Sequence, residues 1–159
     1  SSQNQSKYEA NVASVAGKMD NRVIAAYQQL GFKLVVDPSV NYSGYFDARS
    51  RSITMKQIDD SVYHELGHFL AFIAGNVDKT ASFQSIFAAE KANVTAFNKA
   101  YVTQNASEYF AESVKDYILN NASLKSTRPQ TYAAVQNALN QITDAQIAKI
   151  QKIYGAFWN

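Results

Sequence analysis

The sequence predicts an α+β fold, with an N-terminal helix and a small antiparallel sheet containing a hairpin, followed by a helical bundle. Apolar residues recur at helical spacing before residue 31 and again after residue 58. Between these stretches lie short segments rich in β-branched and aromatic residues, separated by turn-forming residues. The 159 residues are 47% apolar and 13% aromatic, enough for one hydrophobic core, so we expect residues 1–159 to form a single domain.

The first helix is predicted from about Ser6 to Leu30, where Gly31 ends it. Its apolar face would consist of Val12, Val15, Met19, Val23, Tyr27 and Leu30. The segment "FKLVV" predicts a strand that Asp37-Pro38 ends. In "GYFDARSRSITMK", a polar turn joins two further strands, Gly44–Asp47 and Ser52–Lys56.

The rest of the chain is predicted to be helical. Asp59 or Asp60 can cap a helix that runs to Gly75. Four further helices are expected in 82–92, 105–119, 129–139 and 143–158. Their start signals are Asn105 as an N-cap, Pro129 in a first turn, and Thr143 with Gln146 at capping-box spacing.

Composition excludes several classes of function. The net charge is +2 and no basic run of five occurs, so we expect no nucleic-acid partner. No apolar run of about 18 residues is present, so no membrane span is predicted. The chain begins "SSQNQSKYEA", without the apolar core of a signal peptide, which leaves export open. We expect a monomer.

Both histidines of the chain lie in "HELGH", residues 64–68. His64 and His68 are one helical turn apart on the same side, so their imidazoles can share a metal ion. Glu65 projects about 100° round the helix, where it can meet a metal-bound water. Because the chain has no cysteine, a metal would need nitrogen and oxygen ligands.

The predicted helix also has an apolar face opposite the histidines, formed by Val62, Leu66, Phe69, Leu70 and Ile73. This pattern favours a helix that packs its back on the core and turns its histidines to a cleft. Gly67 is expected to leave room beside the metal. The alternative is an ordinary helix with two core or surface histidines.

A third ligand can come from "SEYFAES", where Glu108 and Glu112 are again one turn apart. One glutamate would bind the metal and the other would accept a hydrogen bond from a ligand imidazole. The alternative is a solvated helix with two glutamates. Glu90 is a weaker candidate, because "AAEKAN" is typical of a solvated helix end. Tyr101, expected in a loop, is either an oxyanion stabiliser or a half-buried aromatic residue.

"HELGH" followed forty residues later by "EYFAES" resembles the anthrax-lethal-factor-like zinc metallopeptidases, and most of all the secreted Pro-Pro endopeptidases of Gram-positive bacteria. The resemblance implies a zincin-like domain with one catalytic Zn²⁺ held by His64, His68 and Glu108. It implies Glu65 as the general base and Tyr101 as the transition-state stabiliser. Glu112 would not bind the metal itself but would orient one of the histidine ligands.

The implied function is zinc-dependent hydrolysis of peptide bonds in extended protein substrates, at proline-rich sites, by a secreted or cell-surface enzyme. The resemblance also implies that a sheet-edge strand containing Gly44, Tyr45 and Phe46 pairs with the substrate. The segment 31–56 is shorter than in the Pro-Pro endopeptidases, so the catalytic residues carry over better than the specificity. The helix over 143–158 is additional to the family pattern and has no assigned role.

Two other functions remain possible on the sequence. A non-catalytic lethal-factor-like domain, used for binding, adhesion or toxin docking, would predict a degraded motif, whereas every expected position is filled here. A purely structural metal site would need four protein ligands, which are hard to supply without cysteine or a third histidine.

Overall fold

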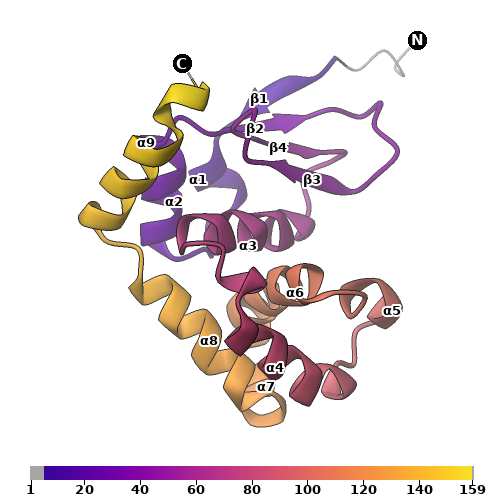
Figure 1. Cartoon of the computed structure of the whole chain (residues 1–159). Coiled ribbons are helices and arrows are strands. Elements are labelled where there is room, and N and C mark those ends of the chain that lie inside the picture. Colours follow the sequence, from indigo (N-terminus) through magenta and orange to yellow (C-terminus); the bar gives the residue numbers. More distant parts are fainter. Residues whose placement is uncertain (1–5, 159) are drawn as a thin grey trace.

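The computed structural model describes residues 6–158, and the predicted α+β fold is confirmed (Figure 1). A small sheet lies on one side of helix α3, and most of the other helices lie on the opposite side. The strands are β1 (Tyr8–Ala10), β2 (Lys33–Val36), β3 (Gly44–Asp47) and β4 (Ser52–Met55). The α-helices are α1 (Val12–Val15), α2 (Asn21–Gln29), α3 (Ser61–Ile73), α4 (Ala81–Glu90), α5 (Lys99–Val102), α6 (Ala106–Leu119), α7 (Asn121–Thr127), α8 (Pro129–Asn140) and α9 (Asp144–Trp158). Two 3₁₀ turns, η1 (Val77–Lys79) and η2 (Lys91–Asn93), flank α4.

The single N-terminal helix predicted from Ser6 to Leu30 is wrong. Its first part is strand β1, which pairs antiparallel with β2, and the remainder is split into α1 and α2. The side chains of Asn11 and Asp20 start the two helices by accepting hydrogen bonds from the backbone N–H groups of Ser14 and Arg22. The apolar positions that suggested one helix still reach the core, although Met19 and Leu30 lie outside the two short helices.

The sheet has the order β1-β2-β4-β3 and is mixed, so the prediction of a purely antiparallel sheet is wrong for its central pair. β3 and β4 form the expected hairpin, and β4 inserts beside β2 in the parallel direction. Burial explains the order: Ile53 and Met55 of β4 are completely buried, whereas β3 is only half-buried. β3 is therefore left at an open edge.

Tyr27 fastens helix α2 to the two central strands. Its buried hydroxyl donates to the carbonyl of Lys33 in β2 at 2.5 Å and accepts from the N–H of Ile53 in β4 at 3.1 Å. Burial raises the pKa of this tyrosine, so the hydroxyl keeps its proton and can make both bonds. The parallel register thus depends on a side chain from outside the sheet.

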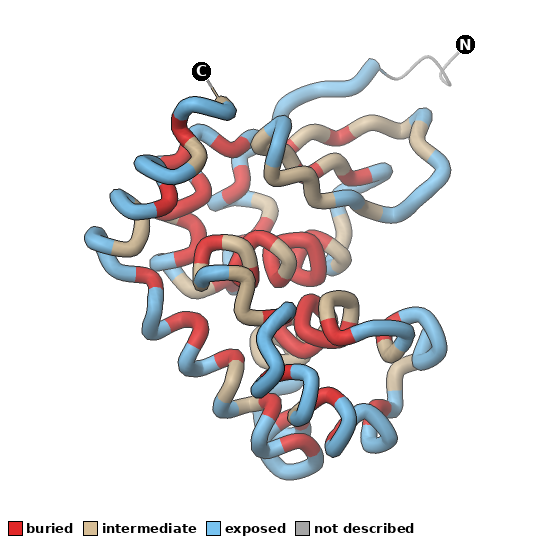
Figure 2. Tube along the Cα trace, viewed as in Figure 1, coloured by how far each residue is buried: buried red, intermediate tan, exposed pale blue. Residues whose placement is uncertain are grey.

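Helix α3 lies between the sheet and α6 and is buried along most of its length (Figure 2). The predicted apolar face is correct, since all five of its residues are at most 1% exposed. His64 and Glu65, on the other side, are also buried, each at 7% exposure. α3 is thus a central helix with a polar side.

Gly67 has a different role from the one predicted. A Cβ at this position would lie 2.6 Å from the carbonyl oxygen of Ala111 and 2.8 Å from its Cα. Both atoms belong to the backbone of α6 and cannot rotate away. Gly67 therefore allows close contact between α3 and α6 and does not leave space beside a metal.

The helix boundaries in the second half follow the predicted signals. The side chain of Asn105 caps α6, and Pro129 is the first residue of α8. The Thr143 hydroxyl accepts from the N–H of Gln146, while the Gln146 side chain donates to the carbonyl of Ile73 at the end of α3. Helices α5 and α7 were not predicted, and Tyr101 lies in α5 rather than in a loop.

Glu90 is not at a solvated helix end, as the sequence suggested, but only 5% exposed. Its carboxylate accepts hydrogen bonds from the N–H groups of Gln130 and Thr131 and from the hydroxyl of Thr131. It thus caps the N-terminus of α8, where a negative charge is favourable. The contact spans forty residues of sequence, so local composition could not reveal it.

We expect Gly67→Ala to lower the free energy of unfolding by about 1–3 kcal/mol, because the added methyl forces α3 and α6 apart. This loss of stability outweighs the gain of up to about 1 kcal/mol that alanine's higher helix propensity brings. Gly155→Ala in α9 is the matched control, since its Cβ would meet only the flexible end of Gln151, at 3.2 Å. Urea unfolding of both variants checks this. A Gly67→Ala protein as stable as the parent would contradict the close-contact role.

Candidate active site

Three side chains from α3 and α6 converge at one point beside the sheet. The Nε2 atoms of His64 and His68 lie 2.9 Å and 3.1 Å from the same oxygen, Oε1 of Glu108. One ligand atom from each residue lies within 4.8 Å of the other two. Among the residues described, this is the group of histidine and acidic side chains that could hold a metal ion. Two imidazole nitrogens and one carboxylate oxygen match the donors of catalytic zinc sites.

Glu112 fixes the orientation of His64. The Nδ1–H of His64 donates to Oε1 of Glu112 at 2.8 Å, which directs Nε2 toward His68 and Glu108. The second oxygen of Glu112 lies 4.0 Å from Nζ of Lys115. Helical spacing alone did not distinguish the two glutamates, but the family resemblance implied Glu108 as the ligand and Glu112 as the orienting residue. In the structure Glu108 faces both histidines, and Glu112 faces only the far side of His64.

The electrostatics of this cluster favour a positive charge at its centre. Burial opposes protonation of His64, but hydrogen bonds to Glu108 and Glu112 outweigh burial and raise its pKa to about 9. Hydrogen bonds from His64 and His68 hold the pKa of Glu108 well below its ordinary range. Burial acts to raise the pKa of Glu112, yet the His64 hydrogen bond prevails and lowers it. Both carboxylates thus stay ionised, and a metal cation could replace the proton on His64.

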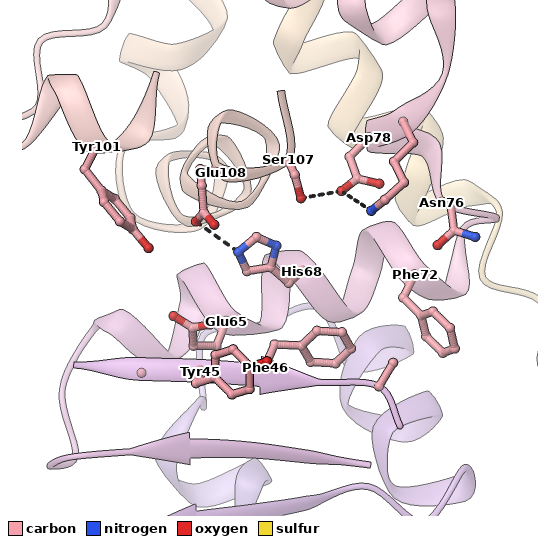
Figure 3. A pocket seen from close by; sticks show the side chains of 13 residues that line it. Tyr45, Phe46, Glu65, His68, Phe72, Asn76, Asp78, Tyr101, Ser107 and Glu108 are labelled. Atoms are coloured by element: carbon pink, nitrogen blue, oxygen red, sulfur yellow. Dashed lines mark hydrogen bonds and ion pairs between the residues drawn. The ribbon is translucent and has the colours of Figure 1, made fainter. Parts of the chain in front are cut away.

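Glu65 lies one residue after His64 and points to the opposite wall of the site, toward β3 (Figure 3). A Cβ on Gly44 of β3 would lie 2.8 Å from Cγ of Glu65, so the glycine makes room for this side chain. Burial raises the pKa of Glu65, while the charges of His64 and His68 act against that rise. A buried carboxylate with a raised pKa is suited to accept and release a proton near neutral pH.

Tyr101 approaches the same space from α5. Its ring centroid lies 6.4 Å from that of His64, and its hydroxyl points toward the gap between Glu108 and Glu65 (Figure 3). The residue is 54% exposed and lines the cleft. Burial of the hydroxyl and the nearby charges of Glu108 and Glu65 raise its pKa, which keeps it a hydrogen-bond donor.

A cleft of about 350 Å³ runs along β3 and is lined by Glu65, His68, Tyr101 and Glu108. Its walls are the edge strand on one side and α5, α6 and the α3–α4 connection on the other (Figure 3). Gly44, Tyr45 and Phe46 all line it. Tyr45 is 57% exposed, whereas the ring of Phe46 stacks beside that of His68, with centroids 6.4 Å apart. Phe46 therefore supports a candidate ligand as well as the cleft wall.

The far end of the cleft contains residues that sequence analysis missed. Asp78 is buried, and one of its oxygens accepts a hydrogen bond from the hydroxyl of Ser107 at 2.7 Å. Its other oxygen, Oδ1, is buried and has no hydrogen-bond partner. Asn76 and Lys79 lie beside it. The stretch "GNVDK" carries no recognisable motif, so only the fold brings these residues to the site.

Residues 47–138 match the family model described as "Anthrax toxin lethal factor, N- and C-terminal domain". A Pro-Pro endopeptidase of Clostridioides difficile (strain 630) is 41% identical over 78 residues, which cover 46% of this chain and 34% of the relative. The match to this relative thus spans about a third of its length.

The matched segment includes every residue of the cluster, from His64 to Glu112. Gly44 of β3 lies before the matched segment, and α9 lies after it. No helix in the described part of the chain is long and apolar enough to cross a membrane. The match covers more than half of the 159 residues, and the chain belongs to the anthrax toxin lethal factor family.

Proposed function

We propose that this chain is a zinc-dependent endopeptidase that hydrolyses peptide bonds of extended protein substrates, and that residues 1–159 form one zincin-like domain. The observation that carries the proposal is the convergence of His64, His68 and Glu108 opposite Glu65 in a cleft along an open sheet edge. Metal ligands, a base and a peptide-sized cleft are the parts that metal-assisted hydrolysis needs.

His64, His68 and Glu108 would hold the zinc ion. When bound, zinc supplies a Lewis acid that lowers the pKa of a water and polarises the scissile carbonyl. Glu112 keeps His64 in the tautomer that presents Nε2, through the 2.8 Å hydrogen bond at Nδ1. The ligands come from two helices whose distance is set by the contact at Gly67. The packing of the core thus holds the three ligand side chains close together.

Glu65 acts as the general base. It takes a proton from the attacking water and passes it to the leaving nitrogen, which its raised pKa allows. The Tyr101 hydroxyl donates a hydrogen bond to the oxyanion that develops on the former carbonyl oxygen. Tyr101 reaches this position from α5, opposite Glu65, so the two groups can act on opposite sides of the reacting carbon.

The open edge of β3 would hold the substrate by strand addition. The unpaired backbone groups of Gly44–Asp47 can bond an extended peptide, which then lies along the cleft. Because a relative is a Pro-Pro endopeptidase, peptides with consecutive prolines are the first substrates to examine. A secreted or cell-surface location in a Gram-positive bacterium, and a monomeric state, complete the proposal.

We expect a diverse peptide library to be cleaved by the parent protein, and cleavage to stop when a chelator removes the metal. Glu65→Gln should lower turnover about 10²- to 10⁴-fold, because the base is lost while the ligands remain. Mass spectrometry of the products and metal analysis of the protein check both results. Glu9→Gln, at an exposed position on β1, is the control. Full activity of Glu65→Gln would refute the mechanism.

The two glutamates of α6 should differ in their effect on metal binding. Glu112→Gln should lower zinc affinity roughly 10- to 100-fold, since it weakens the orientation of His64. Glu108→Gln should lower the affinity further, because it removes the charge of a direct ligand. Competition with a chromogenic chelator measures both. A larger loss in Glu112→Gln would exchange the roles of the two residues.

Tyr101→Phe should lower kcat about 10²- to 10³-fold with little change in KM or metal content, because one oxyanion donor is lost. Tyr8→Phe, also exposed but on β1, is the matched control. Steady-state kinetics on a peptide from the library checks the difference. Equal kcat values for the parent and Tyr101→Phe would remove this hydroxyl from the mechanism.

A further inference from the structure

The C-terminal end of α9 forms an aromatic hollow next to the cleft. The hollow measures about 200 Å³ and is lined by Ala48, Arg49, Phe72, Tyr154, Phe157 and Trp158, which we call the α9 hollow. The rings of Phe72 and Tyr154 lie 4.9 Å apart, and those of Tyr154 and Trp158 are stacked at 5.9 Å. The lining is thus a continuous aromatic wall supplied by α3 and α9.

Most of this wall is held rigidly. The indole N–H of Trp158 donates to the carbonyl of Ala48 at 3.0 Å, which ties the end of α9 to the turn after β3. The guanidinium of Arg51 lies over the Trp158 ring, 5.1 Å from its centroid. A hollow with fixed walls loses little entropy when it binds a side chain.

Phe157 differs from its neighbours. It is 72% exposed, although it lines the hollow together with two well-packed aromatic residues. A packing role does not account for this exposure, because a large apolar side chain gains its stabilisation by leaving water. Phe157 is therefore available to cover an apolar group that enters the hollow.

The α9 hollow continues the catalytic cleft, since Ala48 and Phe72 line both. Glu65 packs against Gly44 at one end of β3, and Ala48 follows directly after its other end. A peptide paired with β3 would therefore run from the reacting bond toward the hollow. Four residues of extended chain span about 13 Å. The length of β3 therefore sets how many residues separate the scissile bond from the side chain that reaches the hollow.

We propose that the α9 hollow binds an aromatic or large aliphatic side chain of the substrate peptide, roughly three to five residues from the scissile bond on the side toward Ala48. This inference rests on the proposed endopeptidase function and gives α9 a role in substrate selection. Arg49 at the rim adds a cation that favours an aromatic ring over an aliphatic chain.

Paired peptides test the proposal. Each pair has the same cleavable sequence and carries either Phe or Ala at one position, three to five residues from the cut bond on either side. The parent should prefer the Phe peptide about 10-fold in kcat/KM at one such position, as burial of one ring implies. Phe157→Ala should reduce this preference to about 2-fold and leave the Ala peptide unchanged. Its fold should persist, because the residue is exposed.

Ile153→Ala is the matched control, since Ile153 is 54% exposed on the same helix but does not line the hollow. This variant should keep the full preference for Phe. If the parent cleaves Phe and Ala peptides equally at all tested positions, the hollow is not a subsite and the proposed function still stands. If Phe157→Ala keeps the preference, the hollow is likewise not the selecting site.

A binding measurement separates failure of the subsite from failure of the enzyme. Trp158 is the single tryptophan of the chain, so its fluorescence reports on the hollow directly. In Glu65→Gln, the Phe peptide should shift the Trp158 emission in a saturable way, and the Ala peptide should not. Saturable binding without cleavage by the parent would support the hollow and contradict the enzyme. An unchanged emission with both peptides would overturn the inference.

Discussion

The contact between α3 and α6 at Gly67 and Ala111 is the constraint on which the site depends. His64, Glu65 and His68 come from α3, and Glu108 and Glu112 come from α6, so the spacing of these two helices sets the distances between the histidines and the glutamates. A single methyl group at Gly67 would overlap with the α6 backbone. Since backbones in contact cannot adjust as side chains can, the geometry of this candidate metal site is a consequence of core packing.

The same packing explains how four ionisable groups tolerate burial. Glu108 and Glu112 each bond to His64, and Glu108 also bonds to His68, so the negative charges face imidazoles rather than apolar groups. Burial acts to raise the pKa values of these carboxylates, whereas their hydrogen bonds to the histidines lower them. Glu65 has no such bond to a histidine, and its pKa is raised. The different surroundings thus shift the pKa values of neighbouring carboxylates in opposite directions.

The wall of the cleft along β3 comes from other elements than the cluster of His64, His68 and Glu108. β3 is open because β4, which carries the more buried side chains, occupies the place beside β2. The end of α9 then fastens to the turn after β3 through Trp158 and Ala48. The family match includes the metal cluster but not α9. In the proposed function, α9 would thus contribute to peptide selection from outside the matched segment, whereas Ala48, Arg49 and Phe72 of the same hollow lie within it.

The sequence by itself determined the local features: the apolar face of α3, the helix starts marked by Asn105 and Pro129, the β3–β4 hairpin, and the pairing of His64 with His68 at one helical turn. Each depends on residues close in the chain, whose spacing follows from the helix or strand period. The tertiary structure alone decided the split of the first helix, the parallel β2–β4 pair, the burial of Glu90, and the different places of Glu108 and Glu112. These depend on contacts between residues far apart in sequence, where burial and hydrogen-bond partners override local preference.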